Sequence, residues 1–202
     1  MRGETEERKP PCLVSATVRR GEGWSKEEAF LLLLELSAGK VLSYLFGPSW
    51  KAVFRGLFRD TRTLFSPPHV LALWRGDVLL GMALGWGSGD RRAKGFYTAF
   101  RLLPHALPRL WRFVPKLVSA GLPSSSYYLS NIAIFPPHQR QGWGRMLLQA
   151  VEEEAARLGD CSVVLDVEKD NTPAFTFYQR NGYHILREFR FFVRMAKPTL
   201  KG

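Results

Sequence analysis

The sequence predicts a single α/β domain, and three observations support this. The chain of 202 residues is 46% hydrophobic, which is enough for one sizeable core and shows no compositional sign of disorder. Apolar runs of strand length recur between segments with helical periodicity. Between residues 129 and 158, one such run leads through a glycine turn directly into a helical pattern. We therefore expect one domain over residues 1–202, built around a strand, a turn and a helix.

The N-terminal part predicts one strand and two helices. Residues 1–11 are charged and end in two prolines, so we expect a loose terminus, followed by a first strand over 12–18. Ser25 with Glu28 three residues later forms a capping-box pattern that would open a helix over the apolar residues up to Leu36. A second helix is predicted over 50–58.

A β-hairpin is predicted next. The apolar runs 69–74 and 77–86 have strand composition and are joined by Arg75 and Gly76, which is a short glycine-containing turn. A loop is expected over 87–90.

Residues 91–126 are predicted to be a helical insertion. Residues 91–120 are rich in Phe, Leu, Trp and Arg, and Pro104, Pro108 and Pro115 should divide them into short helical pieces rather than one continuous helix. Three roles remain open: a lid over a binding site, a packing or homodimer element, and a basic surface helix for membrane or nucleic acid.

The stretch 129–158 predicts an anion site. Pro136 and Pro137 end the strand, and Gly142 and Gly144 open a helix that no Ser, Thr, Asp or Asn between them and Asn131 can cap. The first turn of a helix has unpaired N–H groups and partial positive charge, and Arg140 and Arg145 would add donors, so a phosphate would fit there. Glycines that only ease a tight turn are the alternative.

The next strand is predicted over 162–167, with Asp166 and Glu168 on one face. Gly159 should end the preceding helix, whose exposed face would carry an ion pair between Glu153 and Arg157.

Two motifs together resemble the GNAT superfamily of N-acetyltransferases, and most closely the ribosomal-protein alanine N-acetyltransferases. The first is Gln139-x-x-Gly142-x-Gly144 after an Ile-Ala-Ile strand, with Gln139 where the family often has Arg. The second runs from Leu165-Asp166-Val167 through Asn171 and Tyr178 to Gly182-Tyr183. The resemblance covers about 129–183 and a last hairpin over 183–195. It implies a mixed, mostly antiparallel sheet flanked by helices, whose splayed central strands hold coenzyme A.

The resemblance also implies the activity and the site. Acetyl-CoA would donate acetyl to a primary amine of a small molecule or a peptide N-terminus by direct attack. Tyr178 would be the general acid and Asp166 the general base, with Glu168 or a water relay as a second candidate for the base. The cofactor contacts would be Ile132, Ala133, Ile134, Gln139, Arg140, Gln141, Gly142, Trp143, Gly144, Arg145, Asn171 and Tyr178.

These site residues also have structural interpretations. Asp166 could be a paired structural carboxylate, Tyr178 a core residue, and Asn171 the cap of the helix that begins near Pro173. A protein that binds coenzyme A without catalysis, or a basic nucleic-acid-binding module, is the alternative function.

Charge and composition limit the possible partners of the protein. The net charge of +11 would favour nucleic acid as a partner. Residues 91–151, however, contain no Asp or Glu, so the positive charge is concentrated around the expected cofactor strand and turn. Nucleic acid is therefore the less favoured partner. The apolar run 29–36 is too short for a membrane span, and we expect a cytoplasmic protein. Cys12 and Cys161 have no metal-ligand spacing, and no metal is expected. Because of the acid-free span, we expect an acidic or neutral amine as the acceptor.

Overall fold

The computed structural model describes residues 16–21, 26–110 and 122–199, with the side chains of 106–110 left out. Its elements in chain order are β1 (Ala16–Arg20), α1 (Glu27–Phe46), α2 (Trp50–Arg59), a 3₁₀ turn (Pro67–His69), β2 (Val70–Arg75), β3 (Val78–Trp86), α3 (Ser88–Leu110), β4 (Ser126–Ile134), a 3₁₀ turn (Pro136–His138), α5 (Trp143–Arg157), β5 (Ser162–Glu168), α6 (Thr172–Arg180), β6 (His184–Glu188) and β7 (Phe192–Pro198). The predicted terminus 1–11 and the first residues of the predicted strand 12–18 lie outside the described part.

The strands form one sheet in the order β1-β2-β3-β4-β5-β7-β6. Neighbouring strands pair antiparallel except β4 and β5, which pair parallel. The fold is therefore the predicted mixed, mostly antiparallel α/β arrangement. The helix α5 provides the crossover that a parallel pair requires.

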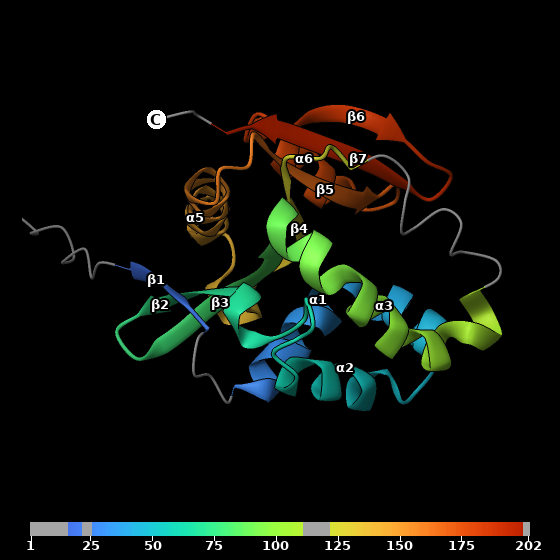
Figure 1. Cartoon of the computed structure of the whole chain (residues 1–202). Coiled ribbons are helices and arrows are strands. Elements are labelled where there is room, and N and C mark those ends of the chain that lie inside the picture. The colour runs from blue at the N-terminus through green and yellow to red at the C-terminus, as the bar shows by residue number, and fades with distance from the viewer. Residues whose placement is uncertain (1–15, 22–25, 111–121, 200–202) are drawn as a thin grey trace, which may run out of the picture.

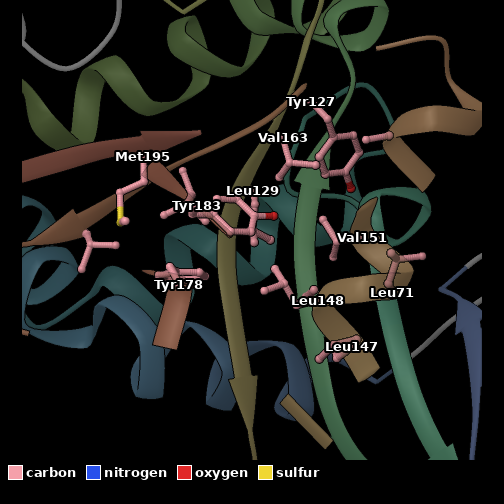
Figure 2. Close-up of a cluster of buried hydrophobic side chains, with 14 of the residues drawn as sticks. Leu71, Tyr127, Leu129, Leu147, Leu148, Val151, Val163, Tyr178, Tyr183 and Met195 are labelled. Carbon is pink, nitrogen blue, oxygen red and sulfur yellow. The ribbon is translucent and has the colours of Figure 1, made fainter. Parts of the chain in front are cut away.

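Each face of the sheet has its own hydrophobic core. Figure 1 shows α1, α2 and α3 gathered on one side of the sheet and α5 on the other. On the α5 side, Leu147, Leu148 and Val151 pack with Leu129 of β4 and Leu165 of β5, and α6 contributes Tyr178 (Figure 2). On the opposite side, helices α1 and α2 pack against β2 and β3 through a second cluster. The splitting of the core into two layers fixes which face each residue of β4 and β5 presents.

The helix α1 is long and apolar enough to cross a membrane by length and composition. Those two properties do not distinguish a membrane span from a core helix, and here Phe30, Leu33 and Leu34 are buried in the second cluster. The predicted capping box is wrong: Lys26 holds the N-cap position without a side-chain bond, and Glu28 pairs with Arg55 at 2.6 Å.

The inserted segment differs from the prediction. Helix α3 already begins at Ser88, where a loop was expected, and it continues past Pro104 to Leu110 instead of breaking into pieces. Tyr97 and Arg101 bond to Asp60 at the end of α2 at 2.8 and 2.7 Å, so contacts with α2 hold the helix in place despite its two prolines, Pro104 and Pro108. The remaining residues, 111–121, lie outside the described part.

One smaller prediction also fails. The predicted ion pair between Glu153 and Arg157 is absent, because Arg157 pairs with Glu154 at 2.9 Å while Glu153 accepts a hydrogen bond from Gln149. Cys161 is exposed.

Candidate active site

The two parallel strands separate halfway along their length. The register pairs Ser126–Leu129 of β4 with Ser162–Leu165 of β5. Both strands continue beyond this point, to Ile134 and Glu168, and within these described residues no further pairing joins them. On its other side, β4 remains paired with β3. The β5-facing backbone groups of the second half of β4 are therefore open to an extended ligand that adds to the sheet edge.

A β-bulge marks the point of separation. The register joins Leu84 to Asn131 and Gly85 to Leu129, so Ser130 is the extra residue on β4. Bulges bend a strand and re-aim its groups, and they are frequent beside active sites. The predicted contacts Ile132, Ala133 and Ile134 follow directly, each half-buried. These three residues therefore lie in the half of β4 that is not paired with β5.

The turn after β4 ends in a backbone arrangement that depends on glycine. Gly142 is the N-cap of α5 with φ 85° and ψ −10°, and no side chain caps the helix. A Cβ added at Gly142 would meet no atom within 4 Å, so the position opens onto free space. Arg140 also has a positive φ, of 61°. The uncapped helix start therefore faces a space that an anion can enter.

Side chains of the turn hold it against its neighbours. The Gln139 amide donates to the Ile134 carbonyl at 2.8 Å, and the Trp143 indole donates to Gln141 at 3.2 Å. The Arg75 guanidinium lies 6.0 Å from the centre of the Trp143 ring, at cation–π range. Gln139, which replaces the family's frequent arginine, thus bonds to the strand end rather than adding charge.

Among the described residues, no carboxylate forms an ion pair with the cations of this turn. Arg140 and Arg145 are exposed, and the first turn of α5 holds no acidic residue, whereas α1 begins with Glu27 and Glu28. With the helix dipole, these cations make the turn a candidate pyrophosphate site.

The predicted base Asp166 is engaged at both oxygens. Arg194 of β7 bonds to it through Nε and an Nη at 2.8 Å each, and the Tyr128 hydroxyl donates to Oδ2 at 3.0 Å. Burial and then Asp166 raise the pKa of Tyr128, so the hydroxyl remains a donor. Arg194 is 2% exposed. This arrangement matches the structural interpretation of Asp166 as a paired carboxylate.

Glu168, two residues further on the same face, is placed differently. It lines a cavity of about 330 Å³ between α1 and the β5–α6 connection. The other residues around it are Glu35, Leu36, Ser37, Ala38, Gly39, Lys40, Asp170, Asn171 and Pro173. In the part of the chain that the structure describes, no side chain forms an ion pair with Glu168. Glu168 thus lines the cavity without an ion-pair partner, whereas Asp166 does not line the cavity and is bonded to Arg194 and Tyr128.

The α1 wall of this cavity is tied to the separating strand. The side chain of Asn131, 7% exposed, donates to the Ser37 hydroxyl at 2.8 Å, and Ser37 in turn donates to the Leu33 carbonyl. Ser130 at the bulge donates to Asn131. This chain of hydrogen bonds fixes the cavity beside the unpaired part of β4.

Tyr178 and Asn171 approach from α6. Tyr178 is 8% exposed and packs on the rings of Phe177 and Tyr183 (Figure 2). Burial raises the pKa of its hydroxyl, which keeps it protonated at neutral pH, as an acid requires. The Asn171 side chain accepts a hydrogen bond from the Ala174 N–H at 3.2 Å and so caps α6, and it also lines the cavity. Each residue therefore has the structural role considered above, and neither role excludes a role in the site.

A second, smaller cavity of about 80 Å³ lies at the far end of the sheet, near Trp86, Tyr127 and Leu158. Its charged groups neutralise one another: Arg20 pairs with Glu154, and Asp90 lies 3.5 Å from both His69 and Lys94. Burial lowers the pKa of His69. This cavity has paired charges and is remote from the separating strands, so it is not the candidate site. Among the described residues, no group of three or more His, Cys, Asp or Glu side chains could hold a metal ion.

Sequence reasoning did not identify Arg75, Tyr128, Arg194, Ser37 or Asp170 as neighbours of the site. Arg75, Arg194 and Ser37 reach the site through tertiary packing, for which the sequence carries no local signal, whereas Asp170 directly precedes Asn171 and could have been found from that position. Helix α3, read as a possible lid, packs on α1 and α2, but none of its described side chains lines the larger cavity.

Solved structures share this fold. An acetyltransferase crystal structure aligns with a TM-score of 0.65 at 17% identity, over 91% of this chain and 99% of that one. The ribosomal-protein-S18-alanine N-acetyltransferase of Escherichia coli aligns with a TM-score of 0.54 at 17% identity, over 92% and 94%. A Bacillus subtilis acetyltransferase solved in complex with CoA gives 0.57 at 18%, over 92% and 100%.

Sequence relatives match over shorter stretches. The L-ornithine N5-acetyltransferase NATA1 of Arabidopsis thaliana is 33% identical over 69 residues, 34% of this chain and 30% of that protein. The ribosomal protein bS18-alanine N-acetyltransferase of Escherichia coli K12 is 38% identical over 56 residues, 28% and 38% of the two chains. These matches therefore span about a third of the relatives' lengths. The family model described as the acetyltransferase (GNAT) family matches residues 41–183, and the chain belongs to that family of acyltransferases.

Proposed function

We propose that this protein is an N-acetyltransferase that moves acetyl from acetyl-CoA to a primary amine by direct attack of the amine on the thioester. One observation carries the proposal: β4 and β5 separate beyond Leu129 and Leu165, between an uncapped helix start and a cavity with an unpaired carboxylate. The family membership and the two relatives, both named for amine acetylation, support the same reaction.

The chain's residues fit acetyl-CoA on the α5 side. The N–H groups from Gly142 to Arg145 and the cations Arg140 and Arg145 would hold the pyrophosphate, with Gln139, Gln141 and Trp143 bracing the turn. Along Ile132, Ala133 and Ile134, the backbone groups that point away from β3 and are not taken by Gln139 would pair with the extended pantetheine arm, next to Asn171. Bound acetyl-CoA supplies a thioester, an acyl group already activated for attack.

The proton transfers fall to two side chains. The acceptor ammonium must lose a proton before it can attack, and Glu168 in the cavity is the base that we favour, directly or through a water. Asp166 remains the second candidate, because its oxygens already accept from Arg194 and Tyr128. Tyr178, held protonated by burial, would donate its proton to the leaving sulfur. A β4 N–H near the bulge would donate to the carbonyl oxygen as negative charge develops.

Direct attack requires no enzyme nucleophile. Cys161 precedes the first residue of β5, whereas Glu168 ends that strand, so the described thiol lies at the wrong end of β5 for a covalent intermediate.

The test is thioester cleavage by the purified protein with a panel of primary amines, with products identified by mass spectrometry. Glu168→Gln should lower kcat about 100-fold and flatten its rise with pH, the usual order for loss of one positioned base. Exposed Glu153→Gln on α5 is the matched control and should leave the rate unchanged. Coenzyme A binding without amine-dependent turnover would instead support the binding-protein alternative.

A further inference from the structure

The larger cavity lies beside the separated strands, where an acceptor amine would approach. It lies on the α1 face of the sheet, opposite α5, because Asp166 and Glu168 project to the side away from Leu165 and Val167. Its volume of about 330 Å³ is at the small end of ligand sites in general, so a small molecule suits it better than a folded protein surface.

The charge around this cavity is mostly negative. Glu35, Glu168 and Asp170 contribute carboxylates, and Lys40 is the one cation among the described residues that line it. Glu35 forms an ion pair with Lys51 at 2.8 Å, and both side chains are about half exposed. Within the described ranges neither Glu168 nor Asp170 has an ion-pair partner. Two uncompensated carboxylates therefore remain at the end of β5.

Three of the α3 cations that the sequence suggested would face the acceptor have other partners. Arg91 of α3 donates to the carbonyls of Pro123 and Ser124, Lys94 lies 3.5 Å from Asp90, and Arg101 bonds to Asp60. No described α3 side chain lines the cavity, so among the described lining residues the carboxylates outnumber the one cation, Lys40. This lining favours a different acceptor from the one expected from the acid-free span.

We infer that the acceptor is a small amine that carries a second cationic group, such as a diamine or a dibasic compound. The inference rests on the proposed function and names its substrate class. One amine gives its proton to Glu168 and reacts, while the second stays protonated near Asp170 and Glu35. Carboxylates that are not neutralised attract such a cation and disfavour an acceptor that ends in a carboxylate.

The experiment compares three acceptors of matched length: 1,5-diaminopentane, n-pentylamine and 5-aminopentanoate. All three carry the reacting primary amine on a five-carbon chain, and their far ends are cationic, uncharged and anionic. We expect kcat/KM to be highest for the diamine, intermediate for the uncharged end and lowest for the carboxylate. Added salt should narrow these differences, because the distant charge is screened.

A charge-removing pair of variants localises the effect. Asp170→Asn should lower kcat/KM for the diamine by about threefold to tenfold, a range typical of a solvent-accessible charge contact, and change n-pentylamine by less than about twofold. Glu153→Gln removes the same charge from exposed α5 on the other face of the sheet and should alter none of the three rates.

The outcomes separate the inference from the function on which it rests. If 5-aminopentanoate is acetylated as fast as the diamine, or if Asp170→Asn affects all three acceptors alike, the substrate class is wrong while the acetyltransferase assignment stands. If no amine accelerates release of coenzyme A, the proposed function fails, and the inference fails with it.

Discussion

The proposed cofactor side and the proposed acceptor side of this site are built from different parts of the chain. The cofactor side consists mainly of backbone: the open edge of β4 and the uncapped start of α5 at Gly142, all within one continuous stretch. The acceptor side consists of side chains from α1 and from the β5–α6 connection, which are more than a hundred residues apart in sequence. A backbone site tolerates changes of side chain but not of conformation, whereas a side-chain site changes selectivity with each substitution.

The largest expected effect is the loss of acetyl-CoA binding when the backbone of the proposed cofactor side is disturbed. Gly142→Glu places a side chain in the open space at the helix start, in a backbone conformation with φ 85°, and adds a negative charge there. Acetyl-CoA binding measured by calorimetry should be lost. Unchanged affinity would show that the pyrophosphate binds elsewhere.

Gly142→Ala sharpens that result, because it keeps the conformational strain without the charge or the bulk. This variant should bind acetyl-CoA more weakly than wild type and more tightly than Gly142→Glu. Thermal unfolding of both variants would separate loss of binding from loss of fold.

A smaller effect should separate binding from chemistry. Tyr178→Phe removes the hydroxyl but keeps the ring that packs on Phe177 and Tyr183, so we expect kcat to fall about 100-fold with little change in acetyl-CoA affinity. In wild type, burial raises the Tyr178 pKa, so this group stays protonated as pH rises through the neutral range and should not cause a loss of activity there. A wild-type rate in the variant would assign the acid elsewhere.

The smallest expected effect on chemistry compares the two carboxylates of β5. Asp166→Asn removes the carboxylate that pairs with the buried Arg194, so it should destabilise the protein by about 2 to 4 kcal/mol, measured by denaturant unfolding. The folded fraction should keep most of its kcat if Glu168 is the base. A flattened pH profile in Asp166→Asn, with normal stability, would return the role of base to Asp166.

Much of the cofactor side could be predicted from the sequence because its signals are local. The apolar run, the prolines that end it and the glycines that open α5 are adjacent in the chain, and the structure places β4, the uncapped turn and α5 where these signals indicate. The hairpin of β2 and β3 followed from its turn, where Gly76 has φ 59°. The two family motifs added the topology of the sheet, which periodicity alone does not contain.

The sequence by itself determined the α/β class, the strand–turn–helix unit and the residue types available for acid, base and phosphate contacts. Tertiary structure decided their roles. Asp166 is neutralised by Arg194 because β7 pairs beside β5, and α3 continues past Pro104 where its side chains bond to α2. The cavity gains its negative charge because α1 packs beside the end of β5. Backbone conformation depends on neighbours in sequence, whereas charge pairing depends on neighbours in space, and only folding brings those together.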